Sequence, residues 1–178
     1  MGVLKTGLGF ISGDYREKAE IVWNLIQGWK FFYENEVVVG IPEEENVARE
    51  NGMTNAGLLY LHEQGVPSHN IPPRPVLKPA IAREDVKGKI ETLMRDAAES
   101  ALVDGNVDNA KVCFEKAGMV GRDACKKYIT EGTHLTPNAP STIERKMEKG
   151  NNKKGAPVPL VDTASMLNSI TYAVRRKK

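Results

Sequence analysis

The chain has 178 residues, of which 40% are hydrophobic and 27% are charged, and its formal net charge is +2. This length and composition predict one globular domain with a core of its own, and the near-neutral charge excludes a strongly basic nucleic-acid binder. No stretch is apolar enough for a membrane span, and the first residues lack the pattern of a secretory signal, so we expect the chain to be made and kept in the cytoplasm.

The N-terminal region predicts an arm followed by one amphipathic helix. Residues 1–13 are rich in glycine and show no periodicity, so we expect a long arm in front of a single domain at 14–178. Asp14 and Glu17 form a capping box, which predicts a helix that runs from there to a stop at Gly28. Ala19, Val22, Leu25 and Ile26 fall on one face of this helix.

The next region predicts a strand, a short helix and a stiff extended segment. Residues 36–41 are mostly β-branched and are followed by proline, which is typical of a strand. Thr54 can cap a short helix that ends at Gly65. Residues 66–82 are rich in proline, which restricts the backbone, so we expect an extended segment close to polyproline II.

The second half of the chain predicts a helical hairpin and a long loop. Apolar residues at helical spacing run from Asp85 to a turn at 104–106, and again from that turn to a stop near Gly132. Residues 132–160 are rich in proline and polar residues, with one small helix signalled over Ser141–Lys149. A loop of this length in a compact domain is usually functional or disordered.

The end of the chain completes the predicted fold. Asp162 or Thr163 can cap one helical turn, and residues 170–174 alternate as in a half-buried strand. Together these elements predict an α+β fold, with a small antiparallel sheet packed on the helical hairpin, a long N-terminal arm and a long proline-rich loop. Cys113 and Cys125 are predicted to be small core residues that cannot pair, because about three helical turns separate them.

Catalytic motifs are scarce in the sequence. His62 and Glu63 begin like the HExxH motif of zinc proteases, but Val66 stands where the second histidine is required. Phosphate-binding and dinucleotide-binding glycine motifs and the nucleophile elbow are also missing, so we expect neither enzyme activity nor a cofactor. One alternative stays open, a small metal-dependent hydrolase that uses His62, Glu63 and His134.

Two charged residues flank the proline-rich segment. Arg74 stands between Pro73 and Pro75, which hold its backbone and so aim its guanidinium group. We expect Glu63, at the end of the preceding helix, to be its bidentate partner. Within one subunit this pair would lock the segment to the helix, and between subunits it would set their register.

Charge is distributed unevenly along the chain. Residues 34–50 are strongly acidic, whereas the C-terminus is basic. Opposite charges on separate parts of one chain suit head-to-tail self-association. The cations that would instead contact DNA phosphates, without reading the base sequence, are Lys153, Lys154, Arg175, Arg176, Lys177 and Lys178.

Taken in order, several segments between residues 36 and 174 resemble the neck, tail-completion and minor tail proteins of tailed phages, which are often labelled virion morphogenesis proteins. The segments that carry the resemblance are 37–41, Asn55-Ala56, Leu61-His62-Glu63-x-Gly65, Ile71-Pro72-x-Arg74-Pro75-x-Leu77-x-Pro79, Leu135-x-Pro137, Ser141-Thr142-Ile143 with Lys146, and Pro159-Leu160-x-Asp162-Thr163-x-x-Met166-x-x-Ser169-Ile170-x-Tyr172. Val76 stands where the family commonly has an aromatic residue, which bears on how this segment packs.

The resemblance implies a structural protein of the virion, located at the neck or the top of the tail, and in the host cytoplasm during assembly. Members of the family form rings around the DNA channel. We therefore expect a hexamer or dodecamer that contacts connector or head-closure proteins and tail terminator or tube proteins. The residues that we expect to orient the chain or to contact neighbouring subunits are Glu63, Arg74, Pro75, Asp162 and Thr163.

Overall fold

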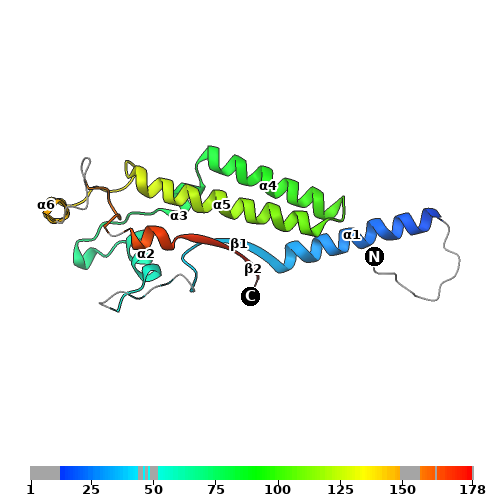
Figure 1. Ribbon diagram of the computed structural model, residues 1–178, viewed down its shortest axis with the longest axis horizontal. Coiled ribbons are helices and arrows are strands. Elements are labelled where there is room, and N and C mark those ends of the chain that lie inside the picture. The colour runs from blue at the N-terminus through cyan, green and yellow to red at the C-terminus, as the bar shows by residue number, and fades with distance from the viewer. Residues whose placement is uncertain are drawn as a thin grey trace.

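The computed structural model is mostly helical and elongated (Figure 1). It describes residues 13–43, 46, 48, 52–148, 157–162 and 164–177. Within these ranges the chain forms seven α-helices and a two-stranded antiparallel sheet, which confirms the predicted α+β class. No helix in these ranges is long and apolar enough to cross a membrane. The predicted arm, apart from Gly13, and residues 149–156 of the predicted loop lie outside the described residues.

The first helix, α1 (Gly13–Glu34), is longer than the sequence predicted. Gly28 does not end it, so that prediction is wrong. The missing side chain instead lets α1 approach α4 (Glu84–Leu102), because a Cβ at position 28 would lie 2.7 Å from the carbonyl oxygen of Ala101 and 2.6 Å from a methyl carbon of Leu102. This glycine therefore marks a close crossing of two helices rather than a stop.

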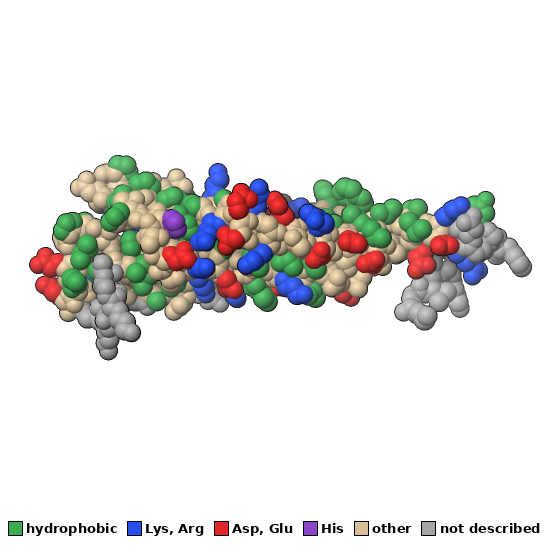
Figure 2. Space-filling model, turned by 90° about the horizontal axis from the view of Figure 1, so that it is seen from above, with side chains coloured by type: hydrophobic (Ala, Val, Ile, Leu, Met, Phe, Trp, Pro, Cys, Tyr) green, Lys and Arg blue, Asp and Glu red, His purple; other side chains and the backbone are tan. Residues whose placement is uncertain are grey.

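The apolar face predicted for α1 is largely exposed. Val22 and Ile26 on that face are 55% and 52% exposed. The C-terminal half of α1, with buried Phe31, packs on the body, whereas the N-terminal half projects beyond the turn between α4 and α5 (Val107–Glu131). Figure 2 shows apolar side chains along the projecting part. The side chain of Asn24 lies against Gly105 of that turn and marks the border. Helical periodicity locates an apolar face but does not show what covers it.

The predicted helical hairpin is confirmed. Helix α5 (Val107–Glu131) follows α4 after a short turn, and the side-chain oxygen of Asn106 caps it by accepting a hydrogen bond from the backbone N–H of Asn109 at 2.9 Å. Gly105 in the turn and Gly132 after α5 have φ angles of 68° and 65°. Most side chains would strain the backbone there, which is why glycine signalled both positions correctly.

The two predicted strands form one antiparallel pair, β1 (Asn35–Gly40) with β2 (Thr171–Arg176). Both strands pack on α5, as expected for a small sheet on the hairpin. A glycine of α5 makes this contact close, because a Cβ on Gly118 would lie 2.3 Å from the ring of Tyr172. The sheet therefore joins the start and the end of the described chain on one helix.

The hydrophobic core has two parts. The first lies where α1 crosses the hairpin, and its buried members are Phe31, Ala97, Ala101, Ala110, Cys113 and Phe114. The second lies toward the other end of α5, and its buried members are Leu59, Val76, Ala80, Cys125, Tyr128, Ile129, Leu135, Met166 and Ile170. Both cysteines are buried and free, as predicted, and burial raises the pKa of the Cys125 thiol to about 11.

Short elements surround the second core part. They are α2 (Asn55–Gln64), a 3-10 turn (Pro67–His69), α3 (Leu77–Ile81), α6 (Pro140–Glu148) and α7 (Ser165–Ser169). The Thr54 side chain caps α2 and Gly65 follows its end, as predicted. The expectation that 66–82 is extended throughout is wrong at the 3-10 turn and at α3. Pro79 lies in the first turn of α3, where amides have no partner within the helix, so proline removes no hydrogen bond there.

Candidate functional site

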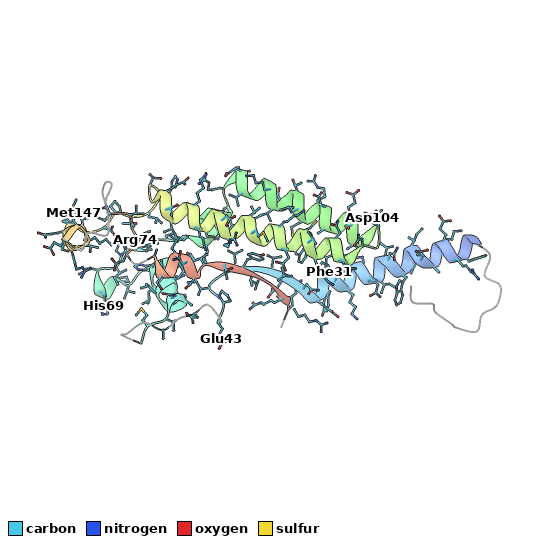
Figure 3. The ribbon with its side chains drawn as sticks, in the orientation of Figure 1. Phe31, Glu43, His69, Arg74, Asp104 and Met147 are labelled. Atoms are coloured by element: carbon cyan, nitrogen blue, oxygen red, sulfur yellow. The ribbon has the colours of Figure 1, made fainter. Side chains whose placement is uncertain are left out.

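One pocket brings together residues that are far apart in the sequence. It has a volume of about 560 Å³ and is lined by side chains of α2, α6 and the segments before α3 and α7. His62, Arg74, Lys146 and Asp162 all contribute to its wall. Figure 3 labels Arg74 at this end of the molecule, opposite the tip of α1. We call this cavity the terminal pocket.

Arg74 clamps two segments together at the rim of this pocket. Its Nε donates a hydrogen bond to the carbonyl oxygen of Thr136 at 2.7 Å, and its Nη2 donates to that of Pro137 at 2.9 Å. Its backbone N–H donates to the carbonyl oxygen of His62 at 2.6 Å. The residue is 8% exposed, and burial lowers the pKa of its guanidinium group from the ordinary value. Arg74 therefore fastens the segment after α5 to the proline-rich segment and to α2.

Glu63 has a different partner from the one that the sequence suggested. Its Oε1 accepts hydrogen bonds from the backbone N–H groups of Val76 at 2.7 Å and Leu77 at 2.8 Å. The predicted bidentate pair with Arg74 does not form within the chain, so that expectation is wrong there. The physical reason is that the first turn of α3 offers unpaired donors and the segment after α5 offers unpaired acceptors. Glu63 nevertheless locks the proline-rich segment to α2, as expected.

Replacing Glu63 with alanine should lower the free energy of unfolding by about 1–2 kcal/mol, because two amides at the start of α3 lose their acceptor. Urea denaturation measures this change, and hydrogen exchange should show faster exchange at the amides of Val76 and Leu77. Gln64→Ala is the matched control, since Gln64 is the exposed next residue of the same helix. Equal stability of the two variants would contradict the capping role.

Lys146 fixes the segment before α7 through hydrogen bonds to backbone carbonyls, as Arg74 fixes the segment after α5. Its Nζ donates hydrogen bonds to the carbonyl oxygens of Val158 at 3.1 Å and Val161 at 2.6 Å, and the residue is 8% exposed. Burial lowers the pKa of this ammonium group, as do the positive charges of Arg74 and Arg145, whereas Asp162 raises it. The sequence pointed to Lys146 through the family resemblance alone, because its own helix pattern gives no signal for a buried lysine.

Asp162 lies in the wall of the terminal pocket, where its charge favours the protonated form of Lys146. The expectation that Asp162 caps the next helix is wrong. The N-cap position of helix α7 is Ala164, whose backbone is left-handed with φ of 59°, and no side chain caps the helix there. Asp162 stands too early in the chain to do so. Thr163 lies outside the described residues, and Pro75 follows Arg74 in the extended stretch before α3.

Asn55 is a fully buried polar residue whose role the sequence did not reveal. Its side-chain nitrogen donates to the hydroxyl oxygens of Ser165 at 3.1 Å and Ser169 at 2.9 Å. These bonds tie the start of α2 to α7 across more than a hundred residues of chain. A buried amide with two hydroxyl partners fixes how two helices meet, because any other arrangement leaves polar groups unpaired.

The metal triad of the hydrolase alternative is not formed. The His134 ring stacks on Tyr128, with ring centroids 5.3 Å apart, and His134 is exposed. One carboxylate oxygen of Glu63 accepts hydrogen bonds from two backbone amides. In the part of the chain that the structure describes, no three His, Cys, Asp or Glu side chains lie together so that they could hold a metal ion.

The basic C-terminus is partly committed to contacts within the chain. Arg175 Nε donates to a carboxylate oxygen of Glu36 at 2.9 Å, and Lys177 Nζ donates to the carbonyl oxygen of Phe32 at 3.0 Å. Arg176 is exposed at the end of β2. The other cations expected to face DNA, Lys153, Lys154 and Lys178, lie outside the described residues. Contact with DNA stays a prediction.

Comparison of the chain with protein-family models, with curated protein sequences and with solved structures gives no match. What the chain does must therefore be argued from its own residues and their geometry.

Proposed function

We propose that the chain is a structural virion protein of a tailed phage, a neck or tail-completion component that forms a ring at the head–tail junction and joins connector to tail. The observation that carries this proposal is that charged residues of the resembling segments hold other segments in place. Glu63, Arg74 and Lys146 come from three such segments, and each is bonded to backbone groups of another segment. These segments are thus needed to build one end of the molecule.

This use of charge favours a structural role over catalysis. A general acid or base must reach a proton of its substrate, whereas these three groups are occupied by backbone carbonyls and amides. These buried groups instead fix the conformation of segments that have no regular helix or strand hydrogen bonds of their own. A rigid end of this kind suits a protein that must present the same surface to each neighbour in an assembly.

The proposal includes the location and the neighbours that the resemblance implies. The protein would be assembled in the host cytoplasm and then reside at the neck or the top of the tail. Its neighbours would be the connector or head-closure proteins on one side and the tail terminator or tube proteins on the other. A ring of identical subunits requires a repeated contact between copies of the chain.

Electron microscopy and light scattering after size-exclusion chromatography test this proposal on the purified full chain. The expected result is a ring of six or twelve copies, and labelled protein at the neck of particles of the phage that encodes it. A chain that stays monomeric and is absent from virions would contradict the proposal. Stoichiometric metal that is lost on His62→Ala would instead support the hydrolase alternative.

A further inference from the structure

An apolar stripe runs along the outer side of α1, away from the hairpin. Its large members are between 52% and 81% exposed. The stripe consists of Tyr15, Ala19, Val22, Ile26, Trp29 and Tyr33. Successive members are separated alternately by four and three residues, which is the spacing of a helix seam that packs against another element.

The stripe has the chemistry of a protein contact. Trp29 is 67% exposed and Tyr33 is 81% exposed. Large aromatic side chains carry much of the energy of protein interfaces, and apolar patches of this kind are uncommon on the free surface of a monomer. In the N-terminal half of α1 the described side chains before Asn24, from Tyr15 to Trp23, are all exposed, so a partner would stabilise this part of the helix.

Charges on the edges of the stripe indicate what kind of partner fits. The positions that flank the seam hold three cations, Arg16, Lys18 and Lys30, and three apolar residues, Trp23, Leu25 and Phe32, but no acidic residue. Glu34 lies within 3.9 Å of Lys30 but stands farther from the seam. Two α1 helices packed on each other would therefore bring positive charges together, which is unfavourable. An apolar surface with acidic edges is the complementary partner.

Helix α6 carries such a surface at the opposite end of the molecule. Pro140, Ile143 and Met147 line a shallow groove with Glu144 and Glu148 at its side. Met147 is 58% exposed, and Figure 3 shows it on the far side of the molecule from α1. The other side of α6 faces the terminal pocket through Lys146, so the groove is on the outer face.

We infer that the apolar stripe of α1 docks on the α6 groove of a second copy of the chain. The two surfaces match in chemistry, because each has an apolar centre and their edges carry opposite charges. The N-terminal half of α1 and helix α6 lie at opposite ends of an elongated molecule, so the contact is head to tail (Figure 1). Contacts of this type generate a ring when the rotation between copies closes. The inference rests on the proposed ring and names the surfaces that build it.

Charge reversal on the full chain tests this pairing. The α1 variant is Arg16→Glu with Lys18→Glu and Lys30→Glu, and the α6 variant is Glu144→Lys with Glu148→Lys. Each variant alone should associate at least about tenfold more weakly than the native chain, because its two edges now have the same sign. An equimolar mixture should regain assembly, because each altered edge then meets one of opposite charge. Sedimentation velocity measures both effects.

Matched controls change the same number of charges on exposed positions of α4, which belongs to neither surface. Lys87→Glu with Lys89→Glu and Arg95→Glu matches the α1 variant, and Glu91→Lys with Asp96→Lys matches the α6 variant. Both controls should associate like the native chain. Circular dichroism verifies that every variant keeps its helices, and Trp29→Ala tests the apolar part of the stripe without any change of charge.

The outcomes separate this inference from the proposed function. Rings that form equally well from native and charge-reversed chains would overturn the α1–α6 contact and leave the proposed ring standing. Variants that lose assembly but are not rescued by mixing would also overturn it, since α1 would then have another partner. A native chain that never associates would overturn both the ring and the contact.

Discussion

Arg74→Ala is expected to lower the free energy of unfolding by about 2–4 kcal/mol, which is a large effect for one residue. The substitution removes two charge-assisted hydrogen bonds, at 2.7 Å to the Thr136 carbonyl and at 2.9 Å to the Pro137 carbonyl. Both carbonyls would be left without this donor at a site where the arginine is 8% exposed. Urea denaturation measures the change.

Two further variants make the Arg74 prediction specific. Arg74→Lys keeps the charge but cannot present two donors in a fixed plane, so its stability should lie between those of the native chain and Arg74→Ala. Arg83→Ala removes ion pairs with Asp85 and Glu131 whose side chains are at least 33% exposed, and it should cost much less stability than Arg74→Ala because solvent screens exposed pairs. Similar losses for Arg74→Ala and Arg83→Ala would contradict the clamp.

Gly28→Ala should destabilise the protein by about 1–3 kcal/mol even though alanine is the better helix former. The added Cβ would lie 2.7 Å from the carbonyl oxygen of Ala101, and a helix backbone cannot move aside as a side chain can. Helix α1 would have to separate from α4, and the packing of Phe31 on Phe114 would loosen.

Gly88→Ala is the matched control for Gly28→Ala, since both residues are glycines within a helix. An added Cβ at position 88 meets nothing within 4 Å, so helix propensity alone should act there. That variant should gain about 0.5–1 kcal/mol in stability. Thermal or urea denaturation of both variants gives the comparison, and a gain of stability at both positions would show that α1 does not depend on the close crossing.

The proposed ring would depend on both Arg74 and Gly28. Arg74 fixes the end of the molecule that carries α6, and Gly28 fixes the direction in which α1 leaves the body. If copies join through these two helices, the angle between them sets whether a chain of subunits closes. A loss of stability at either position should therefore also weaken assembly, although the residues lie outside the proposed contact.

The sequence by itself determined the elements whose signals are local. Thr54 and Gly65 bound α2, and the turn before α5 and Gly132 after it bound that helix, because caps and left-handed positions depend on nearby residues. Both strands were also predicted, since alternation and β-branching are local patterns. The sequence also points to part of the site, namely Arg74 and Asp162 in the wall of the terminal pocket and Glu63 at the end of α2.

Only the tertiary structure decided which groups meet. Glu63 and Arg74 were expected to bind each other, but backbone amides and carbonyls brought in from other segments lie closer to them. In α6 the structure buries Lys146 against two carbonyls and exposes Met147, the reverse of what these residue types usually do. Helical spacing likewise gave an apolar face on α1 that includes Val22 and Ile26, and only the packing shows that both are exposed. Local patterns reveal apolar faces and unpaired hydrogen-bonding groups. Only the packing of distant segments determines which residues contact those faces and groups.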